Sequence, residues 1–123
     1  MSKITVFQIP IRTVSESNST EHWVKKANRH KIQKWMVVKV FRDNKFAFKL
    51  PVEITLIRIA PRTLDKEDNL PMSLKWVKDA IADQLIPGKA PGRADDSKEI
   101  TWKYDQKKGR VRQNLVEVII EEK

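Results

Sequence analysis

The chain of 123 residues has no cysteine, only three glycines and no long apolar run. Without cysteine it can form no disulfide, thiolate zinc site, iron–sulfur cluster or cysteine nucleophile. Its apolar stretches, such as residues 116–120 with Glu117 among them, fall far short of the roughly 20 residues that span a bilayer. The segment 1–10 lacks the apolar core of a signal peptide. We therefore expect a cytoplasmic protein with no membrane partner.

Glycine and histidine are too few for several common kinds of active site. The glycines are Gly88, Gly92 and Gly109, so neither a P-loop nor a G-x-G-x-x-G loop exists and no nucleotide cofactor is expected. The two histidines, His22 and His30, lie on one predicted helix, and no serine lies in a G-x-S-x-G elbow. This pattern disfavours a hydrolytic triad and catalysis by histidine.

Positive charge is what the sequence has in excess. Lysine and arginine number 25 against 16 aspartates and glutamates, which leaves a formal net charge of +9. Such a chain attracts polyanions at long range, and its binding to nucleic acid depends on salt because counterions are released. Nucleic acid is therefore the leading partner, with solubility as the alternative reason for the excess lysine.

Apolar periodicity predicts one α+β domain over residues 1–123. Alternating or β-branched residues predict strands at 4–9, 52–59, 100–104 and 115–120, with a turn at 107–109. A first helix is predicted from Ser19 or Thr20 through Trp35, and residues 36–41 suit a late helical turn or a short strand almost equally. This order indicates a mixed sheet of about four strands with two helices packed on it.

The second helix has the clearest apolar face. It is predicted over about 69–86, with Pro71 in its first turn and Asp68 or Asn69 as its N-cap. The apolar residues that recur at helical spacing are Leu70, Leu74, Val77, Ile81 and Leu85. In contrast, the four tryptophans show no single pattern, and we expect them to fill the core or a dimer contact rather than to stack on unpaired bases. They are Trp23, Trp35, Trp76 and Trp102.

Two groups of carboxylates lie in predicted loops. Asp65, Glu67 and Asp68 precede the second helix, and Asp95 and Asp96 precede the third strand. Oxygen ligands at the ends of elements suit Mg²⁺, which assists phosphodiester cleavage by offsetting charge and activating water. The alternative is that these residues act as helix caps and turn residues.

Four sequence segments occur in an order that resembles the RusA family of Holliday-junction resolvases. They are residues 64–70 (LDKEDNL), Lys75-x-x-x-Asp79-x-Ile81-Ala82, Ala94-Asp95-Asp96, and Trp102-x-Tyr104-x-Gln106-Lys107. Phage and prophage members of the family carry a D-N-L motif that opens a helix and a D-D pair before a W-x-Y-x-Q strand. The resemblance covers about residues 52–121, and residues 18–23 and 31–34 are similar to the family's N-terminal helix.

This resemblance implies a homodimeric endonuclease that depends on Mg²⁺, with Mn²⁺ as the alternative ion. It would bind a four-way DNA junction and nick two opposing strands, in recombination or repair in a bacterial or phage-infected cell. Asp68 and Asp96 match catalytic metal ligands. The family often has a further ligand two residues before the D-N-L aspartate, where this chain has Lys66. Asp65 is our choice for it, because i, i+3 spacing in a helical turn keeps two carboxylates on one side, and Glu67 is the alternative.

Basic residues complete the predicted site. Lys75 matches a helix lysine that the family uses near the scissile phosphate, and the alternative is a solvated lysine. Further residues are expected to contact DNA phosphates. These are Lys25, Lys26, Arg29, Lys78, Arg93, Lys103, Lys107, Lys108 and Arg110.

Two other functions stay open. A basic DNA-binding or architectural protein of the same fold without catalysis is the main alternative, and Lys66 at the displaced ligand position favours it. An RNA-binding module is the weakest alternative, because the aromatic-rich RNP pattern is missing.

Overall fold

The computed structural model describes residues 3–14, 23–67, 69–87 and 97–123. Its elements are β1 (Lys3–Ile9), α1 (Trp23–Asp43), β2 (Val52–Ala60), α2 (Asn69–Leu85), β3 (Ile100–Lys108) and β4 (Leu115–Glu122). The four strands form one sheet in the order β1-β4-β2-β3, in which β2 and β3 are parallel and the other pairs antiparallel. The predicted α+β fold, with a mixed sheet and two helices, is confirmed.

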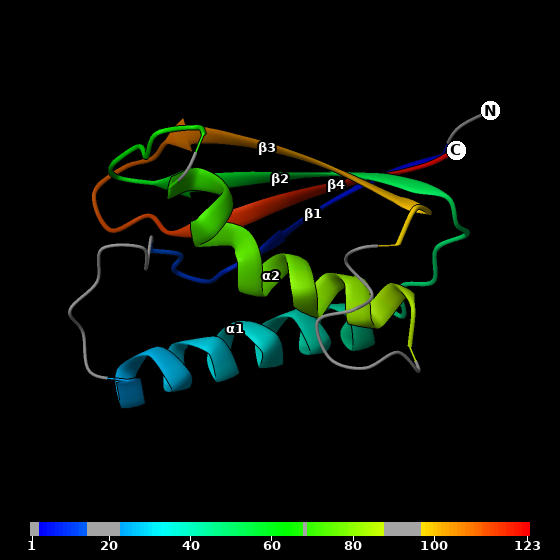
Figure 1. Ribbon diagram of the computed structural model, residues 1–123, viewed down its shortest axis with the longest axis horizontal. Helices are drawn as coiled ribbons and strands as arrows, with labels where there is room; N and C mark the ends of the chain where they lie inside the picture. The colour runs from blue at the N-terminus through cyan, green and yellow to red at the C-terminus, as the bar shows by residue number, and fades with distance from the viewer. Residues whose placement is uncertain (1–2, 15–22, 68, 88–96) are drawn as a thin grey trace.

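Both helices cover the same face of the sheet (Figure 1). Side chains alternate across a strand, so every second residue of β2 and β4 points at the helices. These residues include Ile54, Leu56 and Val118, which are fully buried. From α2 the predicted apolar positions Leu70 and Leu74, among others, pack against them. The core therefore lies between the sheet and the two helices.

The parallel pairing of β2 with β3 decides where the functional segments lie. A parallel pair needs a crossover, here α2, which begins where β2 ends and returns to the start of β3. The loop after β2, the turn between β3 and β4, and the segment after β1 therefore share one end of the sheet (Figure 1). The segment that enters β3 lies at the other end.

The structure decides one element boundary that the sequence left open and corrects another. Helix α1 continues to Asp43, so residues 36–41 are helical. Strand β3 extends to Lys108, so the predicted turn at 107–109 is wrong for Lys107 and Lys108. The reason is that both residues pair with the end of β2, and Gly109 N then donates to Ala60 O at 2.7 Å.

The tryptophans were expected to fill the core or a dimer contact, and the core is ruled out for two of them. Trp23 is 72% exposed and Trp35 is 57% exposed. The buried residues of α1 are Gln33, Val37 and Phe41. Each residue of a helix is rotated by about 100° from the last, so Trp35 lies about 200° around the helix from both Gln33 and Val37 and points away from the core. Trp76 and Trp102 are half-buried.

Within the described ranges neither helix combines the length and apolarity that crossing a membrane requires.

Candidate functional site

The loop between β2 and α2, which carries Asp65, is attached to β3 by one glutamine side chain. Leu64 N donates to Gln106 Oε1 at 2.8 Å, and Gln106 Nε2 donates to Leu64 O at 2.5 Å. Gln106 belongs to the helix-facing series of β3 with Trp102 and Tyr104, because alternate residues of a strand share a face. The glutamine of the W-x-Y-x-Q segment thus positions the acidic loop.

Replacing Gln106 by leucine is expected to lower the free energy of unfolding by about 1–3 kcal/mol, because it leaves two backbone groups of Leu64 without partners. Amide hydrogen exchange should become faster at Leu64. Gln84→Leu is the control, since Gln84 is an exposed residue of α2. Unchanged exchange at Leu64 would show that Gln106 does not hold the loop.

Asp65 is exposed and lies four residues before Asn69, the first residue of α2. Its Oδ2 accepts a hydrogen bond from Asn69 N at 3.2 Å, and its Oδ1 accepts one from Asn69 Nδ2. Its carbonyl oxygen accepts Leu70 N at 2.9 Å. A carboxylate here satisfies free N–H groups of the helix start and complements the helix dipole. Asp65 therefore caps α2.

The reason for choosing Asp65 over Glu67 does not hold in the structure. Asp65 has no regular secondary structure, residues 66 and 67 form a turn, and α2 begins only at Asn69. Asp65 is therefore not part of a helical turn, and the argument from helical i, i+3 spacing does not hold for it. Glu67 is exposed, as is Lys66, whose Nζ lies 3.8 Å from Asp105 Oδ1. The choice between the two carboxylates stays a prediction.

Three predicted site residues, Asp68, Arg93 and Asp96, lie outside the described residues. The described neighbour of Asp96 is Ser97, whose carbonyl oxygen accepts Ile100 N at the start of β3. Ile100 and Gln106 lie six residue steps apart along β3, which corresponds to about 20 Å. Gln106 is the residue that holds the Asp65 loop. The structure does not bring these described flanks of the two acidic groups together. Among the described residues no three acidic or histidine side chains form a metal-binding group, so the shared Mg²⁺ site stays a prediction.

Two predicted basic residues of α2 lie against aromatic rings. Lys75 is exposed, with its Nζ 5.0 Å from the centre of the Trp76 ring. Lys78 Nζ lies 5.5 Å from the centre of the Trp102 ring. Cation–π contacts at exposed sites contribute roughly 0.5–1 kcal/mol. They orient the two ammonium groups and leave each one a charged donor.

On α1, the predicted residues Lys25 and Arg29 line a shallow groove of about 330 Å³ together with Arg12. Gln33 Nε2 donates to Arg12 O at 3.0 Å, which joins the segment after β1 to the helix. Lys26, next to Lys25, is half-buried. The groove therefore gathers positive charge from two segments, as a surface for phosphates requires.

The predicted basic residues of β3 and of the turn after it differ in whether they form ion pairs. Lys103 Nζ lies 2.6 Å from Glu53 Oε1. Hydrogen bonds from Lys103 and, secondarily, from Lys123 lower the pKa of Glu53. Lys107, Lys108 and Arg110 are exposed and form no ion pair with another described residue. Lys107 and Lys108 pair with the end of β2, so they lie at the same end of the sheet as the Asp65 loop. Their ammonium groups are therefore more accessible to an anionic ligand than that of Lys103.

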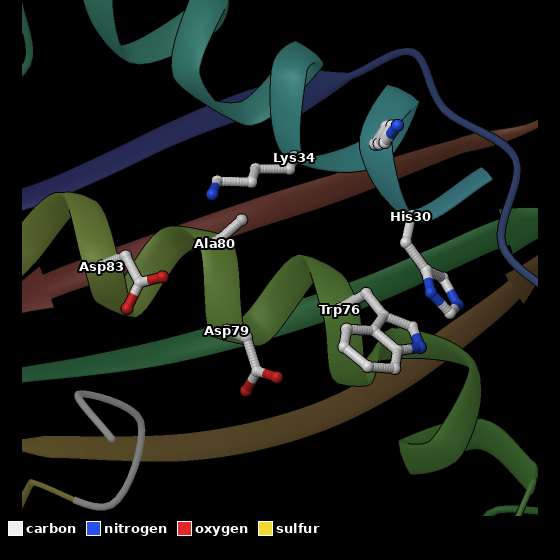
Figure 2. Close-up of a pocket in the computed structure, with 7 residues that line it drawn as sticks. His30, Lys34, Trp76, Asp79, Ala80 and Asp83 are labelled. Carbon is white, nitrogen blue, oxygen red and sulfur yellow. The ribbon is translucent and has the colours of Figure 1, made fainter. Parts of the chain in front are cut away.

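A pocket of about 320 Å³ lies between α1 and α2. Figure 2 shows Lys34 extending from α1 toward α2, and Asp79 and Asp83 projecting from α2. The His30 and Trp76 rings stack there with their centres 4.0 Å apart. His30 thus packs against Trp76 in this pocket.

Sequence reasoning missed a second cationic site, a pocket at the end of the sheet that contains Arg12, Arg58, Arg62 and Arg112. One signal was present in the sequence. Arg58 continues the inward series of Val52, Ile54 and Leu56, where an apolar residue is expected. A charged side chain at a position that faces the core is costly, so it is expected to have a specific role.

Comparison of the chain with models of known protein families and with curated proteins finds no match.

Proposed function

We propose that this protein is a metal-dependent endonuclease that binds four-way DNA junctions as a homodimer and resolves them by paired nicks. The resemblance of its acidic and aromatic segments to the RusA family is the source of this proposal. A twofold dimer suits a junction because two related active sites meet two strands of a nearly symmetric substrate. The proposed setting is the cytoplasm of a bacterial or phage-infected cell.

The observation that supports the proposal best is the position of Asp65. Its exposed carboxylate lies at the start of α2, in a loop that Gln106 attaches to β3. The surrounding end of the sheet carries exposed Lys107 and Lys108, which pair with the end of β2. Acidic oxygens within a basic surface suit a protein that holds a cation next to a bound phosphate backbone.

Asp65 has the hard oxygen donors that Mg²⁺ prefers, so this one described residue of the site suits the ion. Asp65, Asp68 and Asp96 would hold it, with Glu67 as the alternative to Asp65. When bound, Mg²⁺ supplies charge stabilisation at the scissile phosphate and lowers the pKa of a bound water. Lys75 would hold a phosphate oxygen by its ammonium group, which donates three hydrogen bonds.

Cleavage of a synthetic four-way junction tests the proposal. With Mg²⁺ or Mn²⁺, symmetric paired nicks are expected in the four-way junction and none in a linear duplex of the same sequence. A chelator should abolish them. Sedimentation of the protein with the junction should show two chains per junction. Absence of nicks with either ion would refute the nuclease proposal.

A DNA-binding protein without cleavage is the second candidate, and one contact favours it. Both carboxylate oxygens of Asp65 accept hydrogen bonds from Asn69, as expected of a helix cap. Calorimetric titration with Mg²⁺ separates the two candidates. A nuclease should show a site that is lost in Asp96→Asn, whereas a binding protein should show no such site.

A further inference from the structure

The arginine pocket, at the end of the sheet where β2 and β3 finish, has a volume of about 500 Å³. It is lined by three segments: the chain after β1, the end of β2 with its following loop, and the turn before β4. Each segment supplies arginine, and the described lining contains no carboxylate. The lining includes Arg12, Thr13, Arg58, Arg62, Arg112 and Asn114.

Arg58 lines this pocket, and only 7% of the residue is exposed. Its Nε donates to Thr13 Oγ1 at 3.1 Å and its Nη2 donates to Thr13 O at 3.2 Å. Its Nη1 donates to Arg62 O at 2.7 Å. All three acceptors are neutral oxygens. Arg58 thus holds the segment after β1 and the loop after β2 in place, but its charge has no anionic partner in the described part of the chain.

A buried charge without a counterion is costly. Burial lowers the pKa of Arg58, and the nearby charge of Arg12 lowers it further. A guanidinium nevertheless stays protonated in proteins. The pocket therefore keeps its positive charge, and an anion inside it would relieve both the desolvation of Arg58 and the repulsion from Arg12.

Arg112, which also lines the pocket, has an unfavourable backbone conformation. Its φ is 63°, in the left-handed region that a residue with a side chain rarely adopts. Gln113 secures this turn, since Arg110 N donates to Gln113 Oε1 at 2.8 Å and Gln113 N donates to Arg110 O at 3.0 Å. The turn also packs closely on β2, because a Cβ on Gly109 would lie 3.0 Å from Ile59 Cγ2. Strain of this kind often marks a functional position.

Arg12 connects the arginine pocket to the groove of Lys25 and Arg29 on α1, because it lines both. The two hollows thus form one cationic path across this end of the molecule. Guanidinium groups match the geometry of phosphate oxygens and donate to them in pairs. A path of this kind fits a strand with regularly spaced phosphates better than a single small anion.

We infer that the arginine pocket binds one phosphate group of the DNA backbone, next to the phosphates held by α1. This inference rests on the DNA-binding part of the proposed function and does not require cleavage. Arg58 and Arg12 would hold the phosphate oxygens, and Arg62 and Arg112 would close over them from the two neighbouring turns.

Binding measured without divalent ions tests the inference. Arg58 is buried and its replacement can unfold the protein, so the test uses Arg112→Gly and Arg62→Gln, which alter exposed side chains. Arg42→Gln, at the last turn of α1, removes the same charge far from the pocket. By fluorescence anisotropy at one salt concentration, each pocket variant should bind junction DNA about tenfold more weakly, as the loss of a charged hydrogen bond predicts. Arg42→Gln should change the affinity much less.

Arg112→Gly carries an additional signature, because glycine accepts a φ of 63°. Its thermal midpoint should not fall although its DNA affinity does, a combination that a purely structural role would not produce. Inorganic phosphate alone, followed by ³¹P NMR line broadening, should bind to the unmodified protein and less to both pocket variants.

The outcomes separate the two proposals. If the pocket variants bind DNA as well as Arg42→Gln does, the inference is overturned while DNA binding stands. If the pocket variants lose phosphate binding but keep their DNA affinity, the inference is also overturned, since the pocket would then bind free phosphate and not the DNA backbone. A protein that binds DNA through the pocket but never cleaves it refutes the nuclease and supports the inference.

Discussion

Asp68→Asn and Asp96→Asn are each expected to lower the rate of junction cleavage by at least about 100-fold while junction affinity falls by no more than about twofold. A neutral amide cannot replace a carboxylate ligand of Mg²⁺, so the charge stabilisation and water activation that the ion supplies would be lost. DNA binding depends instead on lysine and arginine contacts with phosphates, which these substitutions leave in place. Single-turnover cleavage and anisotropy on the same junction measure the two effects separately.

Asp43→Asn is the matched control. It makes the same change of charge at the far end of α1, where Asp43 pairs with Lys39 at 2.6 Å. Cleavage by this variant should equal that of the unmodified protein. Full cleavage by Asp68→Asn or Asp96→Asn would contradict the assignment of these residues as ligands. Asp65→Asn and Glu67→Gln, compared in the same assay, would decide which of the two completes the site.

Junction affinity is expected to fall by about 1,000-fold between 50 and 200 mM salt, as for proteins that make about six phosphate contacts. The physical reason is the release of counterions from DNA when lysine and arginine neutralise phosphates. The cationic path from the arginine pocket to α1, with Lys107 and Lys108 nearby, has enough charges for this number of contacts. The slope of log affinity against log salt, measured by anisotropy without divalent ions, reports it.

Lysine variants then identify which charges contribute to the slope. Lys25→Met and Lys108→Met should each reduce it by roughly 1. Lys103→Met should change it less, because the Lys103 ammonium is paired with Glu53 at 2.6 Å. A slope near zero would show that the net charge of +9 serves solubility and not DNA binding. Equal effects of Lys103 and Lys108 would show that the ion pair opens when DNA binds.

Local sequence patterns were sufficient for most of the elements. The spacing of Leu70, Leu74, Val77 and Ile81 predicted α2 and its buried face, and all four residues are fully buried. The alternation of Val52, Ile54 and Leu56 likewise predicted β2. Patterns failed where pairing with a distant strand decided the outcome, as in the extension of β3 to Lys108 along the end of β2.

The candidate site divides in the same way. The residues of the acidic loop and the basic residues could be named from sequence, because carboxylate, lysine and arginine chemistry is visible in the letters. The role of Gln106 in holding Leu64 could not be derived from spacing, since the two residues lie 42 positions apart. Which tryptophans lie outside the core could not be derived either, because the exposure of Trp23 and Trp35 depends on which stripe of α1 faces the sheet.

Sequence by itself determined the excess of positive charge, the two helices and four strands, and the chemical types of residue available for binding DNA and a cation. Only the tertiary structure decided which of them meet. Arg12, Arg58 and Arg112 are far apart along the chain, and they converge because β1 and the crossover unit β2-α2-β3 finish at one end of the sheet. Periodicity is a property of neighbouring residues, whereas this convergence follows from strand order and the direction of each crossing.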